Sequence, residues 1–217
     1  MTITLKAGST VMFTGDSITS FVRRPGDDRA AYALQVAGRW CFDHPDRPLT
    51  WLNTGYPGDA TTDLEARWQA DVLDARPDVV SVLVGINDVG RRTIVPEAPV
   101  ISTEEYAATY DRLLKPLADA GARLILVEPF LLHVEAVVEA GPHRVRIGER
   151  ERAEWRAELE PRIEVVHELA NRYDAELLPA DRMFAGLGEP QRWSEDGVHL
   201  TAAGHSALAE AWLSLVA

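Results

Sequence analysis

The chain has 217 residues, a length that suits one sizeable α/β domain with a substantial core, which we expect to span residues 1–217. Hydrophobic residues make up 46% and charged residues 26%, a composition typical of soluble globular proteins. The 34 acidic residues outnumber the 22 basic ones and give a formal net charge of −12. This charge argues against a nucleic-acid partner and against an anionic membrane surface, because both attract basic patches.

The N-terminus and the cysteine content favour a cytoplasmic protein. Met1–Gly8 lacks the apolar core of a secretory signal, and no segment approaches the length of a membrane span. Cys41 is the only cysteine, so the chain can form neither an intrachain disulfide nor a thiolate metal cluster. Because Cys41 lies in the apolar helical stretch Val36–Phe42, we expect it to be a small core residue and not a nucleophile.

Five short runs, most of them apolar, are candidate strands. In chain order they are Thr10–Phe13, Thr50–Asn53, Val79–Val84, Arg123–Val127 and Ala175–Leu178. The third and fourth are almost continuously apolar, which is typical of parallel strands that are covered on both faces.

Helical patterns lie between these runs. A capping box at Thr62–Glu65 precedes apolar residues at a spacing of four, and Ser102–Glu105 forms a second capping box. A long helix is expected over about Glu149–Tyr173, bent near Pro161, and a last helix over Ala202–Leu215.

Strands that alternate with helices predict a parallel sheet with helices on both faces. With right-handed crossovers, the expected α/β fold is a three-layer α/β/α sandwich around a flavodoxin-like five-stranded parallel sheet. No internal repeat, low-complexity tract or linker divides the chain. The segment Leu131–Gly148 is too irregular for one helix and too long for a simple loop, so we expect a surface excursion there.

Three short polar patterns follow predicted strands or precede the last helix. They are Gly15-Asp16-Ser17, Gly85-Ile86-Asn87-Asp88 and Asp196-Gly197-Val198-His199. Each alone has a structural explanation: a turn or helix start, a turn with a helix cap, and a turn whose histidine packs on the last helix. The predicted fold brings all three to one edge of the sheet, where open α/β proteins bind their ligands.

These residue types suit nucleophilic catalysis. A serine hydroxyl is a weak nucleophile until a base takes its proton, and Asp196 with His199, three residues apart, can supply a base and the carboxylate that orients it. A tetrahedral intermediate also needs donors for its oxyanion. The candidates are the N–H groups of Ser17 and Gly58 and the side-chain amide of Asn87.

On these residues the chain resembles the SGNH hydrolases of the GDSL esterase/lipase superfamily. The family's four blocks, which supply Ser, Gly, Asn and His in this order, correspond to Gly15–Thr19, Asn53–Asp59, Gly85–Asp88 and Asp196–His199. The resemblance implies Ser17 as nucleophile, His199 as base and Asp196 as its orienter, without a cofactor. It implies an oxyanion hole formed by Ser17, Gly58 and Asn87.

A finer resemblance is to the bacterial acetylxylan-esterase-like branch, which removes acetyl groups from sugar hydroxyls. It rests on the segments Asp63–Val72, Pro77–Val82, Gly85–Val89 and Glu128–Phe130 and on Trp193. The chain departs from the pattern in two places. Gly90 stands where an aromatic residue often follows, which would remove one wall of the substrate pocket, and Leu200 replaces a proline that is common after the histidine.

Several residues keep alternative interpretations. Asp16 and Trp193 are candidate substrate-binding residues, and Trp193 is either a stacking surface for a sugar ring or a core residue. His205 could assist His199 but is expected to cap or pack. The other histidines are His44, His133, His143 and His167. His133 and Glu135 could form a metal pair, yet no third ligand lies at a recognisable spacing, so we expect no metal.

The sequence therefore predicts a serine esterase that cleaves short acyl, in particular acetyl, esters of a carbohydrate through an acyl-enzyme. Its expected partner is a small-molecule ester, and a homo-oligomer is compatible with the sequence. One alternative is a thioesterase or lysophospholipase for longer acyl chains, which the polar residues Arg23, Arg24, Asp27, Asp28 and Arg29 disfavour. Another is a non-catalytic sugar-binding module, which would lack at least one residue of the set Ser17, Asn87, Asp196 and His199, whereas all four are present.

Overall fold

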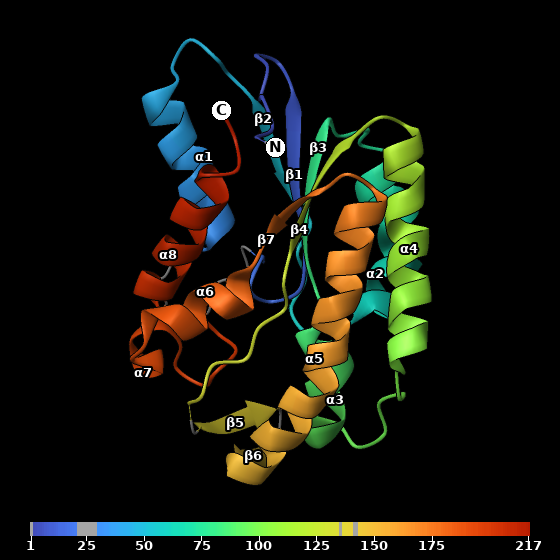
Figure 1. The fold of residues 1–217 in the computed structure, drawn as a ribbon, viewed down its shortest axis with the longest axis vertical. Helices are drawn as coiled ribbons and strands as arrows, with labels where there is room; N and C mark the ends of the chain where they lie inside the picture. The colour runs from blue at the N-terminus through green and yellow to red at the C-terminus, as the bar shows by residue number, and fades with distance from the viewer. Residues whose placement is uncertain (1, 21–29, 135, 141–142) are drawn as a thin grey trace.

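A computed structural model of the chain, which describes residues 2–20, 30–134, 136–140 and 143–217, has a five-stranded parallel sheet at its centre (Figure 1). The strands are β1 (Thr10–Gly15), β2 (Thr50–Asn53), β3 (Val79–Leu83), β4 (Arg123–Val127) and β7 (Glu176–Leu178). Their order is β2-β1-β3-β4-β7, and every neighbouring pair is parallel. The predicted flavodoxin-like sheet is confirmed.

Helices cover both faces of the sheet. In Figure 1, α1 (Tyr32–Asp43) and α8 (Ala202–Leu213) lie on one side, and α2 (Thr61–Trp68), α4 (Thr103–Asp119) and α5 (Glu149–Arg172) lie on the other. A π-helical turn, Gln69–Leu73, continues α2. The remaining helices are α3 (Ile86–Ile94), α6 (Ala180–Leu187) and α7 (Pro190–Trp193). In the described part of the chain, no helix is both long and apolar enough to cross a membrane.

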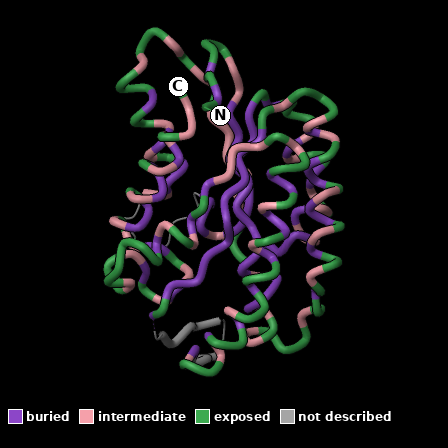
Figure 2. The backbone as a smooth tube through the Cα atoms, viewed as in Figure 1, coloured by how far each residue is buried: buried purple, intermediate pink, exposed green. Residues whose placement is uncertain are grey.

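The core is divided by the sheet, because successive side chains of a strand point to opposite faces. Val11 and Phe13 of β1 join the apolar cluster beneath α1 and α8, whereas Met12 joins the cluster beneath α2 and α4. Figure 2 shows the buried chain following the central strands, with exposed residues along the outer faces of the helices. The sheet is therefore covered on both faces, as its apolar strands predict.

The helix starts agree only partly with the sequence. The cap at Ser102 is confirmed, since its hydroxyl accepts a hydrogen bond from Glu105 N at 3.2 Å. The expected cap at Thr62 is wrong: α2 begins after Ala60, whose N–H donates to Asp63 Oδ2 at 3.0 Å. A tertiary contact explains the shift, because Thr61 is bound through its N–H and its hydroxyl to the carboxylate of α3 residue Asp88.

Cys41 is exposed, so the expectation of a core cysteine is wrong. The buried face of α1 consists of Tyr32, Ala33, Val36 and Trp40. These residues recur at helical spacing and form one stripe, and position 41 falls beside it. The neighbouring Trp40 fills the core position instead.

The segment after β4, expected to be an irregular surface excursion, begins with buried residues and contains two strands. Leu131, Leu132 and Val134 are buried. They lead to an antiparallel pair of strands, β5 (Ala136–Ala140) and β6 (His143–Ile147), which Figure 1 shows beyond the carboxyl ends of the central strands. The sequence analysis missed this pair because both strands are short and carry charged residues, although Gly141-Pro142 between them is a turn signal.

The backbone at Gly15, the last residue of β1, requires a glycine. Its φ is +142°, and a Cβ at this position would lie 1.9 Å from the carbonyl oxygen of Leu83. We predict that Gly15→Ala lowers the free energy of unfolding by more than the roughly 1–3 kcal/mol that backbone strain alone costs, because the clash adds to it.

Gly38 in α1 is the matched control, since a Cβ there would lie more than 4 Å from every neighbouring atom in the part of the chain that the structure describes. Gly38→Ala should stabilise the protein by about 0.5–1 kcal/mol, because alanine is favoured over glycine within a helix. Urea unfolding measures both changes, and equal effects of the two variants would contradict this account of Gly15.

Candidate active site

Ser17 lies just beyond the carboxyl end of β1 and is half-buried. After Gly15 the chain turns tightly, with the N–H groups of Thr19 and Ser20 donating to Asp16 O at 3.2 and 3.1 Å. This turn presents the serine at the edge of the sheet where the sequence predicted a ligand site.

Ser17, His199 and Asp196 form one hydrogen-bonded chain. Ser17 Oγ lies 3.1 Å from His199 Nε2, and His199 Nδ1 lies 2.7 Å from Asp196 Oδ2. The second oxygen of Asp196 accepts from the backbone N–H groups of Val198 and His199, at 2.9 and 2.7 Å. An imidazole in this position can take the serine proton while the carboxylate orients the ring.

The surroundings of Asp196 keep it ionised. Burial on its own would raise the pKa of this carboxyl, but the hydrogen bond from His199, the charge of that imidazole and the two backbone N–H groups together lower it. A carboxylate that stays charged can stabilise an imidazolium formed beside it.

Residues 194–200, here called the His199 loop, are held together by a serine that the sequence did not single out. Ser194 is fully buried; its hydroxyl donates to His199 O at 2.8 Å and accepts from Gly197 N at 2.9 Å. Ser194 and Leu200 also form an antiparallel bridge that closes the loop. The only sequence signal was a short polar residue near a turn.

The His199 loop is also docked on the segment that follows β4. Leu132 N donates to Gly197 O at 2.8 Å, and a Cβ on Gly197, whose φ is +91°, would lie 2.6 Å from Leu132 O. The neighbouring Leu131 is fixed in turn: its N–H donates to Asp181 Oδ1 at 3.3 Å, and Arg156 donates to its carbonyl oxygen.

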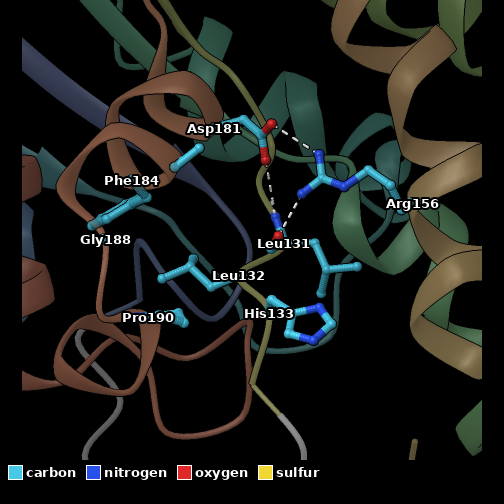
Figure 3. Close-up of a pocket in the computed structure, with 9 residues that line it drawn as sticks. Leu131, Leu132, His133, Arg156, Asp181, Phe184, Gly188 and Pro190 are labelled. Atoms are coloured by element: carbon cyan, nitrogen blue, oxygen red, sulfur yellow. Dashed lines mark hydrogen bonds and ion pairs between the residues drawn. The ribbon is translucent and has the colours of Figure 1, made fainter. Parts of the chain in front are cut away.

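Figure 3 shows Arg156 and Asp181 on either side of this segment, joined by an ion pair of 2.8 Å. Beside them is a cavity of about 300 Å³ between residues 131–133, α6 and the start of α7. The cavity touches the segment that carries the His199 loop but includes neither Ser17 nor His199 in its lining.

The expected oxyanion donors lie at the ends of neighbouring strands. Gly58, after β2, is exposed with a φ of +87°, and a Cβ there would meet no atom of the described residues within 4 Å. Asn87, in the first turn of α3, donates one amide hydrogen to Asp59 O at 3.0 Å, which orients the side chain and leaves its second hydrogen for a ligand.

Two buried acids support this edge of the sheet. Asp59 is paired with Arg67 Nε at 2.7 Å, and its pKa is raised because burial outweighs that pairing. Asp88 binds Thr61 through both oxygens; burial raises its pKa to about 6, although these bonds and the charge of Arg162 lower it. These contacts tie the start of α2 to the helix that carries Asn87.

The burial and contacts of Asp16 and Trp193 do not favour a role in substrate binding. The Asp16 side chain is fully buried, so the expected role in substrate binding does not fit its position. Trp193 is half-buried and packs against the core, and its Nε1 donates to Gly188 O at 2.7 Å. The guanidinium of Arg192 lies 4.8 Å from its ring centroid. These contacts favour the core interpretation of Trp193 over the stacking one.

Gly90 does not open a substrate pocket, so that expectation is wrong. It is buried in α3, and a Cβ there would lie 2.8 Å from the ring of Trp155 in α5. Trp155 is itself buried and donates from Nε1 to Thr93 Oγ1 at 2.8 Å. The tryptophan of a distant helix fills the volume that an aromatic residue at position 90 would otherwise take.

His205 and His133, two other histidines considered from the sequence, can be placed in the structure. His205 is buried, and its Nδ1 accepts from Tyr32 N at 3.2 Å, so it packs and caps as expected. His133 is exposed, and Glu135, its proposed metal partner, lies outside the described residues. The polar rim Arg23, Arg24, Asp27, Asp28 and Arg29 also lies outside them.

A serine, an imidazole and a carboxylate in one hydrogen-bonded chain, at the edge of a flavodoxin-like sheet, define the class of serine hydrolases. Residues 13–207 match the GDSL-like Lipase/Acylhydrolase family. An acetylxylan esterase from Geobacillus stearothermophilus is 30% identical over 222 residues, which cover 95% of this chain and 93% of that protein. The chain belongs to the GDSL-like lipase/acylhydrolase family, and it is a carboxylic ester hydrolase.

Solved structures agree with this assignment. A mutant of an acetyl-xylooligosaccharide esterase from Geobacillus has a TM-score of 0.80 at 27% identity, covering 99% of this chain and 96% of that one. An α/β hydrolase from the metagenome of Lake Arreo, Spain, has a TM-score of 0.78 at 28% identity, covering 97% and 95%. The predicted resemblance to the acetylxylan-esterase-like branch is confirmed.

The two hydrogen bonds of the Ser194 hydroxyl, to His199 O and from Gly197 N, are here called the Ser194 clamp, and they yield a prediction. Ser194→Ala should lower the free energy of unfolding by about 1–3 kcal/mol, because it leaves the buried Gly197 N–H without its acceptor. It should also lower kcat by roughly ten- to a hundred-fold, since a displacement of about 1 Å in a reacting group can cost about 10²-fold.

Ser214→Ala is the control, because the Ser214 hydroxyl donates to Ala211 O at the exposed end of α8, away from the His199 loop in the sequence. Urea unfolding and ester hydrolysis are measured on both variants. Wild-type kcat in Ser194→Ala would show that the clamp does not position His199.

Proposed function

We propose that this protein hydrolyses short-chain acyl esters, in particular acetyl esters of carbohydrate hydroxyls such as those of acetylated xylo-oligosaccharides, through an acyl-enzyme at Ser17. The observation that carries the proposal is the hydrogen-bonded chain from Ser17 Oγ through His199 to Asp196. The activities named for the Geobacillus relatives support acetyl as the acyl group and a xylose-containing sugar as the alcohol.

Acylation begins at the serine. Ser17 Oγ bonds to the ester carbonyl carbon as its proton passes to His199 Nε2, and the carbonyl electron pair moves onto oxygen. Asp196, held ionised 2.7 Å from His199 Nδ1, stabilises the imidazolium. The N–H groups of Ser17 and Gly58 and the free amide hydrogen of Asn87 bind the oxyanion.

The tetrahedral intermediate then collapses. The carbon–oxygen bond to the sugar breaks, and the leaving oxygen takes the proton from His199. In deacylation, water attacks the acyl carbon while His199 accepts its proton, and the returning proton restores Ser17 as the acid departs. Each proton thus moves through the same imidazole, and no cofactor enters the cycle.

The roles of the three residues yield a prediction. Ser17→Ala and His199→Ala should each lower kcat by about 10⁴-fold or more, and the double variant should lose little further, because the residues act as a unit. Asp196→Asn should be milder, since the imidazole persists without its orienter. Steady-state hydrolysis of an aryl acetate measures the losses, and circular dichroism checks the fold. Retention of a tenth of wild-type kcat by Ser17→Ala would contradict the proposal that Ser17 is the nucleophile.

The substrate is tested separately. Released acetate is measured with acetylated xylo-oligosaccharides, and kcat/KM is compared for acetyl and octanoyl p-nitrophenyl esters. The proposal expects acetate release from the sugar and a preference for the acetyl ester. A preference for octanoyl would favour a thioesterase or lysophospholipase. No turnover and no labelling of Ser17 by a fluorophosphonate would favour a non-catalytic sugar-binding module.

A further inference from the structure

Asp16 is a buried acid that the reaction as described does not use. It stands between Gly15 and Ser17, and its side chain is fully buried. Oδ1 accepts from Ile18 N at 3.0 Å, whereas Oδ2 has no hydrogen-bond partner among the residues that the structure describes. A buried carboxylate with one bare oxygen is costly, and a neutral carboxyl is much less so.

The groups around Asp16 are mostly acidic or neutral. From the elements packed against it, the titratable and charged groups are Asp59 after β2, Asp88 of α3, Tyr32 of α1, Tyr106 and Tyr110 of α4, and His199. Arg67 of α2 reaches Gly15 O at 3.5 Å, but its ion pairs are with Asp59 and Asp71. Among the groups named here, His199 is the one whose positive charge lowers the pKa of Asp16, and His199 is itself paired with Asp196 at 2.7 Å.

These surroundings raise the pKa of Asp16 to about 7. Burial is the largest cause, and the negative charges of Asp88 and Asp59 add to it. The hydrogen bond from Ile18 N–H and the charge of His199 act in the opposite direction. The carboxyl therefore changes its charge within the pH range in which esterases are assayed.

We propose that Asp16 is a positioning residue for ester hydrolysis that must carry its proton, because a neutral side chain keeps negative charge away from the oxyanion bound at Ser17 N–H. The inference rests on the proposed function of Ser17. The peptide that joins Asp16 to Ser17 supplies that N–H, so an ionised Asp16 opposes the oxyanion from the adjacent residue. Its bare oxygen also lacks a donor that could neutralise the charge.

The test is the pH profile of kcat/KM for an aryl acetate between pH 5 and 9, with spontaneous hydrolysis subtracted. The wild type should lose activity, by about tenfold or more, as the pH rises above the pKa of Asp16. Asp16→Asn keeps an acceptor for Ile18 N–H but cannot ionise. It should match the wild type within about threefold near pH 6 and lack the alkaline decline.

Asp88→Asn is the control, because it removes another buried acid whose charge acts on Asp16. Asp88 raises the pKa of Asp16, so the alkaline decline should persist in this variant and move to lower pH. Loss of the decline in Asp88→Asn, with its retention in Asp16→Asn, would assign the titration to Asp88 and overturn the proposal.

Stability supplies a second readout. The folded-state pKa of Asp16 is raised from 3.8 to about 7, so the folded protein holds a proton that the unfolded chain releases. The associated stability is fully present below pH 3.8 and is lost as the pH rises through about 7. The melting temperature of Asp16→Asn relative to the wild type should therefore increase between pH 5 and 8.

Three outcomes overturn the proposal: an equal loss at every pH in Asp16→Asn, a wild-type profile without an alkaline decline, or a constant difference in melting temperature. If Asp16→Asn does not fold, Asp16→Ser, whose hydroxyl can still accept from Ile18 N–H, is used in its place. A wild type that hydrolyses no ester refutes the proposed function instead, so the two failures are distinguishable.

Discussion

The hydrogen bond between His199 Nδ1 and Asp196 Oδ2, at 2.7 Å, is the contact on which the site depends. Both residues lie in an irregular loop, so no helix or strand fixes them. Ser194 closes the loop from inside, Leu132 binds it from the side, and Thr201 caps α8 directly after it. Backbone hydrogen bonds thus replace regular structure, and the imidazole stays 46% exposed for a substrate while its orientation is set.

Ser17 and Asn87 are positioned by the sheet, because the chain turns sharply at a glycine after each of two neighbouring strands. β1 and β3 are parallel neighbours, and each is followed or ended by a glycine of nearly equal φ, +142° at Gly15 and +143° at Gly85. A Cβ would collide with Leu83 O at the first and with Pro129 at the second. Two sharp turns side by side therefore bring Ser17 and Asn87 to one edge, which a smooth strand end would not do.

The elements that could be predicted depend on local pattern. The five strands follow from short apolar runs, and Ser17, Asn87 and His199 stand out because each follows or precedes such an element. Features that arise from contacts between distant segments could not be predicted. Trp155, which fills the space above Gly90 from another helix, is one such feature. The role of Ser194 is local, with partners three and five residues away, but it depends on the conformation of an irregular loop that no periodic pattern predicts.

The charges beneath the site are coupled, and this coupling explains how a buried acid can persist there. The positive charge of His199 lowers the pKa of Asp16. A neutral imidazole removes that positive charge and so favours the protonated form of Asp16. The resting enzyme, in which His199 must be neutral to act as a base, therefore also favours a neutral Asp16. Asp59 and Asp88 strengthen this state through their own charges, although each is hydrogen-bonded elsewhere. A neutral imidazole and a protonated Asp16 thus favour each other, which agrees with the role proposed for Asp16.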